Sequence, residues 1–257
     1  GDTSLKGNVV VNEDSADKDF RVESNGNANM VFVDGGNDSV GIGISNPASY
    51  CQHADELVVG GTDGNRGITI VGGDDDYSII DFNRASNTSD TPNGAIEYNH
   101  TDNAMYIKAN AIAGIQMDNV GRVAKPYQPY FFGGRSGGTA TSGDFVSNVS
   151  QTNTGNHYNT STGKFTAPVA GRYYCMFGNF VSPSATSTGH YQVSLRVNSS
   201  STKFFYFGHT DGSHSPIHFS DVITLAANDT VCHHLHGGIS VYGSDWTYAT
   251  QAFYLLG

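Results

Sequence analysis

The sequence has few charged residues and no long apolar run, and both features exclude classes of partner. Charged residues make up only 14% of the 257 residues, and the formal net charge of −11 is spread along the chain without a cluster of Lys or Arg. A surface that binds a phosphate backbone concentrates positive charge, so we expect no nucleic-acid partner. No window approaches the roughly 20 apolar residues that a membrane helix needs, so we also expect no membrane insertion.

Cysteine is scarce as well. The three residues Cys51, Cys175 and Cys232 match no metal-binding spacing, and they cannot all pair within one chain. Unpaired cysteine is among the most buried residue types. We therefore expect three small buried hydrophobic side chains rather than a disulfide framework.

Glycine, by contrast, is abundant. The chain has 32 glycines, and Asn, Ser and Thr fill the gaps between short runs of Val, Ile, Phe and Tyr. This composition is typical of strands and turns rather than of helices, so it predicts an all-β protein. The pattern changes near residue 125, and we predict two parts, 1–125 and 126–257.

The first part consists of short strands that cannot close a core of their own. The stretch 29–43 alternates as strand, Gly-Gly-Asn turn and strand, and 114–123 repeats this plan in shorter form. Four more short strands are predicted at 67–73, 78–85, 94–100 and 104–111. Their apolar residues are too few to bury one face of each strand within a single chain. We therefore predict a repetitive β-hairpin shaft that closes its core as an intertwined homotrimer.

The same part resembles a known class of fibrous proteins. The run 19–47, together with 96–107 and 117–123, is similar to the repetitive shaft segments of bacteriophage tail-fibre and other appendage proteins. The resemblance implies a trimer on the virion surface, outside the cell. Because the chain begins at Gly1 rather than Met, we expect a further N-terminal part, through which the trimer would contact other virion proteins.

The second part carries a more specific pattern in 155–177, GNHYNTSTGKFTAPVAGRYYCMF. A Tyr, a Thr-Gly turn, Lys-Phe, Ala-Pro and Gly-x-Tyr follow one another in this order, as Tyr158, Thr162, Gly163, Lys164, Phe165, Ala167, Pro168, Gly171, Arg172 and Tyr173. The order resembles the signature of the globular head of complement component one-q and of its relatives in the tumour-necrosis-factor superfamily.

Later stretches continue this resemblance at 191–200, 220–235 and 250–256. Two residues depart from it, since Thr250 stands where an aromatic residue is usual and Ala252 replaces the usual glycine. The resemblance implies a ten-stranded type of jelly-roll sandwich over 126–257, which assembles as a compact threefold trimer.

The residues support a sandwich independently of the resemblance. Gly163 stands where a tight turn needs a positive φ. Phe165, Tyr173, Cys175 and Phe177 alternate towards one face, as a strand of a sandwich requires. The segment is therefore predicted to be scaffold rather than a site.

Because a fold by itself implies no activity, position and surface have to indicate the function. We predict a virion appendage protein, a tail fibre or similar, that is not an enzyme and whose trimeric head binds a host-cell surface receptor, a glycan or a protein. Two alternatives stay open: a purely structural capsid decoration or neck fibre, and a glycan depolymerase built into the fibre. The depolymerase needs two carboxylates at a defined separation. Its candidates are Glu97 with Asp81, or the acidic run 74–76, although acidic runs beside glycine are usually solvated turns.

Recognition is expected on the loops between jelly-roll strands, because the sandwich holds those loops rigid. The loop 237–250 contains the only tryptophan, Trp246, flanked by Tyr242 and Tyr248, with Asp245 beside them. Aromatic faces stack on sugar rings, and a carboxylate accepts hydrogen bonds from hydroxyls. These four residues form the predicted receptor site. The alternative is that Trp246 packs beneath the loop or against a neighbour in the trimer.

Histidine is concentrated in the second part. In the loop 208–218, His209 and His214 are the second candidates for receptor binding. His234 and His236 are two residues apart, so on a strand both point to one side, and three such pairs would offer six imidazoles to one octahedral metal ion on a trimer axis. The alternative is that these histidines are exposed and bind no metal. No other cofactor is expected.

Overall fold

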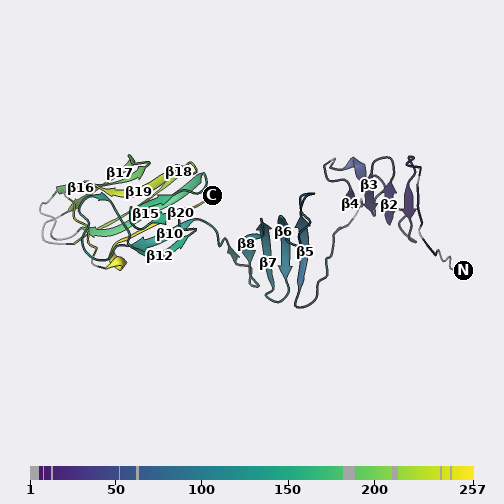
Figure 1. Ribbon diagram of the computed structural model, residues 1–257, viewed down its shortest axis with the longest axis horizontal. Coiled ribbons are helices and arrows are strands. Elements are labelled where there is room, and N and C mark those ends of the chain that lie inside the picture. The colour runs from purple at the N-terminus through teal and green to yellow at the C-terminus, as the bar shows by residue number, and fades with distance from the viewer. Residues whose placement is uncertain are drawn as a thin grey trace. The chain divides into compact units, whose positions relative to one another are not determined.

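The computed structural model of the protein describes residues 6–7, 9–12, 14–51, 53–61, 64–181, 189–209, 214–237, 239–243 and 245–257. The chain divides into two compact units, Gly1–Gly73 and Asp74–Gly257, whose strands are drawn in Figure 1. Over the described residues the regular structure is strand apart from two short 3-10 helices, which confirms the all-β class. None of the described segments forms a helix long and apolar enough to cross a membrane. The elongated shaft and its boundary after residue 125 stay predictions.

The first unit contains a four-stranded sheet in the order β1-β2-β3-β4. Its elements are β1 (Phe20–Val22), β2 (Val31–Asp34), β3 (Ser39–Ile42), the 3-10 helix η1 (Pro47–Ser49) and β4 (Leu57–Val59). The hairpin predicted over 29–43 is formed by β2 and β3. Its turn is held by Asp34 Oδ1, which accepts hydrogen bonds from the backbone N–H groups of Gly36 and Asn37, and Asp38 takes a φ of 54°. A short polar turn therefore sets the register.

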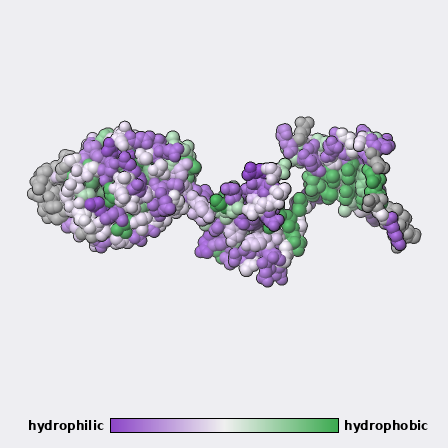
Figure 2. Space-filling model, viewed as in Figure 1, coloured by the Kyte–Doolittle hydropathy of each residue, from purple (hydrophilic) through white to green (hydrophobic). Residues whose placement is uncertain are grey.

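The sheet of the first unit leaves apolar surface uncovered. Phe20, Val22 and Leu57 are 42%, 43% and 59% exposed, and Figure 2 shows hydrophobic surface gathered along one side of this unit. The strand predicted over 67–73 is absent, since these residues take no regular structure. Ile68 and Val71 in this segment are 70% and 86% exposed. An alternating apolar pattern needs a core to pack against, and the described part of one chain gives these side chains none.

The second unit begins with a five-stranded antiparallel sheet in which each strand pairs with the next. It contains β5 (Tyr77–Phe82), β6 (Gly94–Asn99), β7 (Ala104–Ala109), β8 (Ile112–Met117) and β9 (Val123–Ala124). The strands predicted at 78–85, 94–100 and 104–111 are thus confirmed as β5, β6 and β7. The predicted hairpin at 114–123 corresponds to β8 and β9.

The two faces of the β5–β9 sheet differ in polarity. Ile80, Ile96, Ile107 and Ile115 lie directly opposite one another on four neighbouring strands, so their side chains share one face; we call it the isoleucine face. Their exposed fractions are 46%, 38%, 46% and 38%, so no second layer built from the described residues covers them. The charged residues of these strands alternate onto the other face, the polar face: Asp81, Glu97 and Lys108.

The rest of the second unit is a sandwich of two sheets, the head (Figure 1). One sheet has the order β12-β10-β20-β15-β18, and the other has the order β13-β14-β19-β16-β17 with β11 paired to β19. The first contains β10 (Tyr130–Gly134), β12 (Val149–Thr154), β15 (Gly171–Val181), β18 (Ser215–Leu225) and β20 (Thr250–Leu255). The second contains β11 (Gly143–Asp144), β13 (Tyr158–Asn159), β14 (Lys164–Thr166), β16 (Gly189–Val197), β17 (Ser200–His209) and β19 (Thr230–Leu235).

Aromatic side chains fill the space between these two sheets. Phe165, Tyr173, Cys175 and Phe177 are each at most 1% exposed, which confirms the predicted alternation towards one face. Phe253 of β20 stacks on Phe165 with ring centroids 5.5 Å apart. The head therefore closes a core within a single chain.

Single positions in the chain test two finer predictions. Gly163 has a φ of 75°, and a Cβ added there would lie 2.5 Å from the carbonyl oxygen of Phe145, so the Thr-Gly turn requires glycine as predicted. Cys175 and Cys232 are free and buried, also as predicted, but Cys51 is exposed. That prediction was wrong because Cys51 lies between η1 and β4, outside the strands that bury Phe32 and Ser39 in the first unit.

Candidate functional site

Residues predicted for receptor binding meet in one pocket of the head. The pocket has a volume of about 240 Å³ and is lined by Phe180, His214, Tyr242 and Tyr248; we call it the aromatic pocket. Phe180 belongs to β15, His214 precedes β18, and Tyr248 ends the 3-10 helix η2 (Trp246–Tyr248). His214, Tyr242 and Tyr248 come from the two loops that the sequence indicates for recognition, so the fold brings those loops together.

The rings of the aromatic pocket contact one another edge to face. The Tyr242 ring centroid lies 5.3 Å from that of His214 and 5.8 Å from that of Tyr248. The rings of Phe180 and Tyr248 are 6.1 Å apart at an interplanar angle of 73°. An edge-to-face pair covers at most one face of one of its rings, and Tyr248 is 51% exposed. The pocket therefore offers aromatic faces to a ligand.

Backbone contacts fix Tyr242 in this arrangement. Val241 forms isolated β-bridges with Ala140 and Val181, and Tyr242 N donates to Phe180 O at 2.7 Å. Two walls of the pocket are thus tied to the scaffold through main-chain hydrogen bonds. Such a site is largely formed before a ligand arrives.

Asp245 shapes the loop rather than the pocket wall. Its Oδ1 accepts hydrogen bonds from Thr247 N and Thr247 Oγ1, both at 2.9 Å, which makes it the N-cap of η2. These bonds, led by the one from the backbone of Thr247, hold the pKa of the Asp245 carboxyl below its usual value. The predicted carboxylate therefore positions Tyr248 through the helix that it caps.

Trp246 and His209 do not contribute a described wall of the aromatic pocket. Trp246 is half-buried in η2, and a Cβ added to Gly134 of β10 would lie 2.6 Å from the Trp246 carbonyl oxygen and 3.1 Å from its Cβ. This close approach places the start of η2 beside β10, and both alternatives for the Trp246 ring stay predictions. The side chain of His209 falls outside the described residues.

The histidine pair considered for a metal does lie together, with the rings of His234 and His236 5.0 Å apart. Each ring has a protein partner, however: His234 Nδ1 lies 2.7 Å from Asp144 Oδ1, and His236 Nε2 lies 3.0 Å from Ser194 Oγ. Burial, and then the neighbouring His234, hold the pKa of His236 below its usual value. Among the residues that the structure describes, no group of three His, Cys, Asp or Glu side chains could hold a metal ion.

Among the carboxylates considered for glycan cleavage, Glu97 is held in an ion pair. Glu97 is 6% exposed and ion-paired with Lys108. In the register, Asp81 lies opposite Ala95 rather than opposite Glu97. The run 74–76 is an exposed turn that precedes β5. Because the Glu97 carboxylate contacts Lys108, it is not placed as one of two free carboxylates flanking a bound glycan.

Sequence reasoning missed one wall of the aromatic pocket, Phe180. A signal was available, because β15 alternates buried residues with the series Tyr174, Met176, Gly178 and Phe180 on its outward face. The sequence does not show, however, which end of the outward face of β15 lies beside a recognition loop. Phe180 becomes a candidate only when β15 is known to end beside Tyr242.

One family model matches the chain, that of the C1q domain, over residues 138–256. The match takes in β11 to β20. The C-terminal part of the chain, a jelly-roll sandwich, is therefore similar to the C1q domain, as the resemblance of 155–177 predicts. C1q domains are generally non-catalytic binding modules, and domains of the C1q and TNF families form homotrimers.

Solved structures similar to this chain include three from animals. The globular domain of zebrafish complement 1qA protein is 19% identical, with a TM-score of 0.41, over 51% of this chain and 98% of that chain. Eiger TNF from S. frugiperda is 11% identical, with a TM-score of 0.40, over 51% and 93%. Rabbit GITRL is 14% identical, with a TM-score of 0.30, over 37% and 73%. No curated protein matches the chain.

Proposed function

We propose that this protein is a homotrimeric, non-catalytic recognition protein whose C-terminal head binds carbohydrate. The observation that carries the proposal is the aromatic pocket of Phe180, His214, Tyr242 and Tyr248. Aromatic faces stack on the apolar faces of sugar rings, while tyrosine hydroxyls and histidine nitrogens exchange hydrogen bonds with sugar hydroxyls. The volume of about 240 Å³ lies below the range of about 300–1,000 Å³ for drug-sized ligands, which suits one terminal sugar.

An uncovered aromatic row on the head supports the trimer. Tyr130, Tyr254 and Tyr174 lie opposite one another on β10, β20 and β15, and Val222 of β18 continues the row. The side chains of the three tyrosines point away from the core, because the residues on either side of each tyrosine are buried. A contiguous aromatic face is a typical interaction surface, and copies of one chain associate through such faces with closed symmetry.

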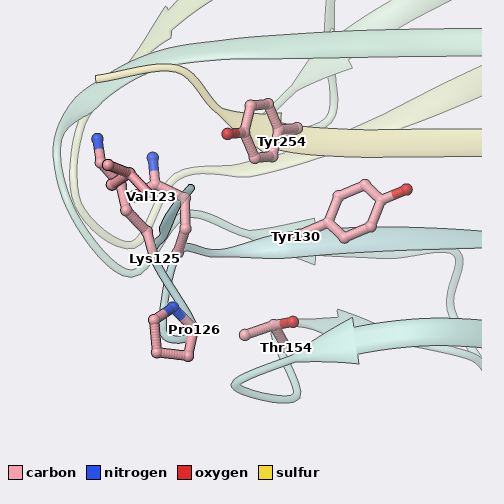
Figure 3. Close-up of a pocket in the computed structure, with 7 residues that line it drawn as sticks. Val123, Lys125, Pro126, Tyr130, Thr154 and Tyr254 are labelled. Carbon is pink, nitrogen blue, oxygen red and sulfur yellow. The ribbon is translucent and has the colours of Figure 1, made fainter. Parts of the chain in front are cut away.

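A second pocket opens on the same face, where the chain enters the head. It has a volume of about 440 Å³. Figure 3 shows Tyr254, Tyr130 and Thr154 on three neighbouring strands, with Val123 and Pro126 of the preceding segment beside them. The rings of Tyr130 and Tyr254 meet edge to face with centroids 5.7 Å apart. We propose that a neighbouring copy of the chain fills this pocket in the trimer.

The isoleucine face supports association of the β5–β9 sheet in the same trimer. Burying it against other copies places no charge in the interface, because the charged residues of the strands lie on the polar face. Only residues 125–129 separate β9 from β10. A trimeric head would therefore hold three isoleucine faces at high effective concentration.

The location on a virion surface, with a receptor on a host cell, is also a proposal. Its support is the similarity of three segments to fibre shafts, namely 19–47, 96–107 and 117–123. The similar proteins, by contrast, give no sign of a viral origin. Antibodies against the head should label the tips of appendages on virions from the source of this sequence. Labelling of the capsid or neck would instead favour the structural alternative, and release of glycan fragments by the purified protein would favour the depolymerase.

Replacement of one pocket residue tests carbohydrate binding. Tyr248→Ala removes a ring that is half exposed, so the head should keep its melting temperature. We expect affinity for the best ligand on a glycan array to fall at least about tenfold, as the loss of a stacking contact worth about 1.4 kcal/mol predicts. The matched control is Tyr206→Ala, since Tyr206 is 69% exposed on β17.

The proposal fails if Tyr248→Ala binds as the parent protein does, or if both tyrosine variants lose affinity equally. Equal loss would indicate a general effect of removing surface tyrosines. An array on which the parent protein binds nothing also contradicts it.

A further inference from the structure

The polar face of the β5–β9 sheet contains a cleft that is separate from the head pocket. Its volume is about 360 Å³. Its lining includes three tyrosines and three polar or charged side chains, namely Tyr77, Tyr106, Tyr127, Asn99, Asp102 and Lys108. Tyrosines together with hydrogen-bonding groups are a typical lining for a polar ligand with ring faces. No role in the recognition head uses this cleft.

Two of the tyrosines flank a lysine on this face. Tyr77 lies opposite Asn99 and Tyr106 lies opposite Glu97 in the register, which puts both rings on the polar face. Lys108 Nζ lies 6.0 Å from the Tyr77 ring centroid and 5.8 Å from that of Tyr106. These distances are at the outer limit of cation–π contact, so the ammonium group is about equally far from both rings.

A buried ion pair holds this lysine in place. Lys108 Nζ contacts Glu97 Oε2, and the two side chains are 26% and 7% exposed. Burying charges has a desolvation cost that their attraction offsets only in part, so a buried ion pair is weak grounds for expecting extra stability. The pair has a clearer consequence for the cleft, because it fixes a cation at the floor.

Asn99 connects the tyrosine wall to a carboxylate at the rim. It is 7% exposed, and its Nδ2 donates to Tyr77 Oη at 3.2 Å and to Asp102 Oδ2 at 2.9 Å. Its Oδ1 accepts from Thr101 N at 2.9 Å. Because Tyr77 Oη is the acceptor in this contact, its proton is available to another acceptor, and the Asp102 carboxylate can accept further hydrogen bonds.

From these contacts we infer a second carbohydrate site, in which a neutral hexopyranose lies against the Tyr106 ring. Its hydroxyls bond to Lys108, Asp102 and the Tyr77 hydroxyl. The charges favour a neutral sugar, because Glu97 neutralises Lys108 and Asp102 leaves one negative charge at the rim. An acidic sugar would meet that charge at close range.

This site does not depend on the head pocket. The cleft and the isoleucine face are on opposite sides of the same sheet, so association of copies through the isoleucine face leaves the cleft open. If the trimer forms, it carries three such clefts, and a glycan with repeated neutral units would gain avidity. A monomer would bind with the affinity of one cleft.

The test is titration calorimetry on the full chain carrying Tyr248→Ala, which removes a wall of the head pocket. The probes are cellotetraose, maltotetraose and laminaritetraose, with tetragalacturonate as the acidic comparison. We expect at least one neutral tetrasaccharide to bind more tightly than tetragalacturonate. Adding Tyr106→Ala should lower that affinity at least tenfold, whereas Tyr106→Phe, which keeps the ring, should stay within about threefold of the parent. Tyr206→Ala is the control that should change nothing.

Tyr77→Phe is a second variant that tests ligand binding in the cleft, and it keeps the aromatic ring in the sheet. It removes one hydroxyl from the cleft and should weaken binding by about threefold, as the loss of one hydrogen bond predicts. The inference is overturned if no neutral tetrasaccharide binds, if tetragalacturonate binds most tightly, or if Tyr106→Ala or Tyr77→Phe binds as the parent does. None of these results bears on the head pocket, whose own test is Tyr248→Ala alone.

Discussion

The head and the β5–β9 sheet are built from the same kind of strand but differ in what covers them. In the head, Phe165, Phe177 and Phe253 are fully buried, because two sheets of one chain face each other. In the β5–β9 sheet, Ile80 and Ile107 are each 46% exposed. The comparison shows that closure of a second layer, rather than strand propensity, separates a self-sufficient domain from one that needs other copies.

Local structure is specified equally well in both regions. Asn103 between β6 and β7 has a φ of 50°, and Asn228 before β19 has a φ of 71°. Asparagine tolerates this left-handed conformation better than most residues do. Turns form for the same reason in both regions, so the difference arises at the level of packing.

The largest effect is expected from Phe253→Ala, which breaks the core that the head closes by itself. The Phe253 ring lies 5.5 Å from Phe165 and 5.1 Å from His233. Truncating a fully buried phenylalanine costs about 3–5 kcal/mol, so the head should melt roughly 10 °C lower or more. Hydrogen exchange in β5 to β8 should change little. Phe204→Ala, where the side chain is 47% exposed, is the control, and an equal effect of the two variants would contradict the account.

The second largest effect is a pH dependence confined to the head. His233 is fully buried among aromatic rings, with Nδ1 2.7 Å from Gln251 Oε1, and burial lowers its pKa to about 4. The folded head therefore holds the His233 ring in its neutral form. The contribution of this neutral ring to the stability of the head is complete above the unfolded pKa of about 6.5, and it is lost as the pH falls towards 4. The loss amounts to about 3 kcal/mol between pH 7 and pH 4.

Chemical denaturation at several pH values measures this loss. His233→Phe should flatten the dependence between pH 6.5 and pH 4, while the parent protein loses stability across that interval. A parent protein whose head is equally stable at pH 7 and pH 4 would show that His233 is charged or exposed in the folded head.

The third prediction tests the uncovered region directly. Ile107→Asp places a charge in the isoleucine face, and if other copies cover that face the substitution should cost about 2 kcal/mol or more per chain. The control is Gln116→Asp on the polar face, which adds the same charge opposite Tyr106 and Ala124. Thermal unfolding should show a lower first transition for Ile107→Asp only, with the transition of the head unchanged. Equal effects of the two substitutions would mean that the isoleucine face is not an interface.

The smallest effect concerns the loop that shapes the aromatic pocket. Asp245→Ala removes the acceptor for Thr247 N and Thr247 Oγ1 and loosens η2, so glycan affinity should fall roughly threefold. Asp245→Asn keeps an acceptor oxygen and should bind as the parent does. A full loss of binding with Asp245→Ala would instead place its carboxylate on the ligand.

Much of the fold could be predicted from the sequence, because short sequence patterns determine the strands and turns of the head. Two features predict the strands of the head and their buried face. They are the turn at Gly163 and the alternation of Phe165, Tyr173, Cys175 and Phe177. The segment 67–73 alternates as convincingly and yet forms no strand, since nothing in its own composition says whether a partner strand exists. Local pattern fixes what a segment prefers, whereas pairing is decided by the rest of the chain.

The candidate site was predictable in part for the same reason. Tyr242, Tyr248 and His214 stand out because aromatic residues in loops are unusual, and the structure brings them together. Phe180 joins them from a strand, whereas Trp246, the only tryptophan of the chain, does not line the pocket. The cleft on the polar face was not predictable, because Tyr77, Asn99 and Lys108 come from three strands whose register the sequence does not state.

The central claim is that the isoleucine face is closed by other copies of the chain, and the mass in solution tests it most directly. Sedimentation equilibrium of the full chain at micromolar concentration should give three times the chain mass of 27.3 kDa. Hydrogen exchange in the same sample should show protected amides in β5 to β8. A species of 27.3 kDa with those amides equally protected would contradict the account, because the sheet would then be stable without a second layer.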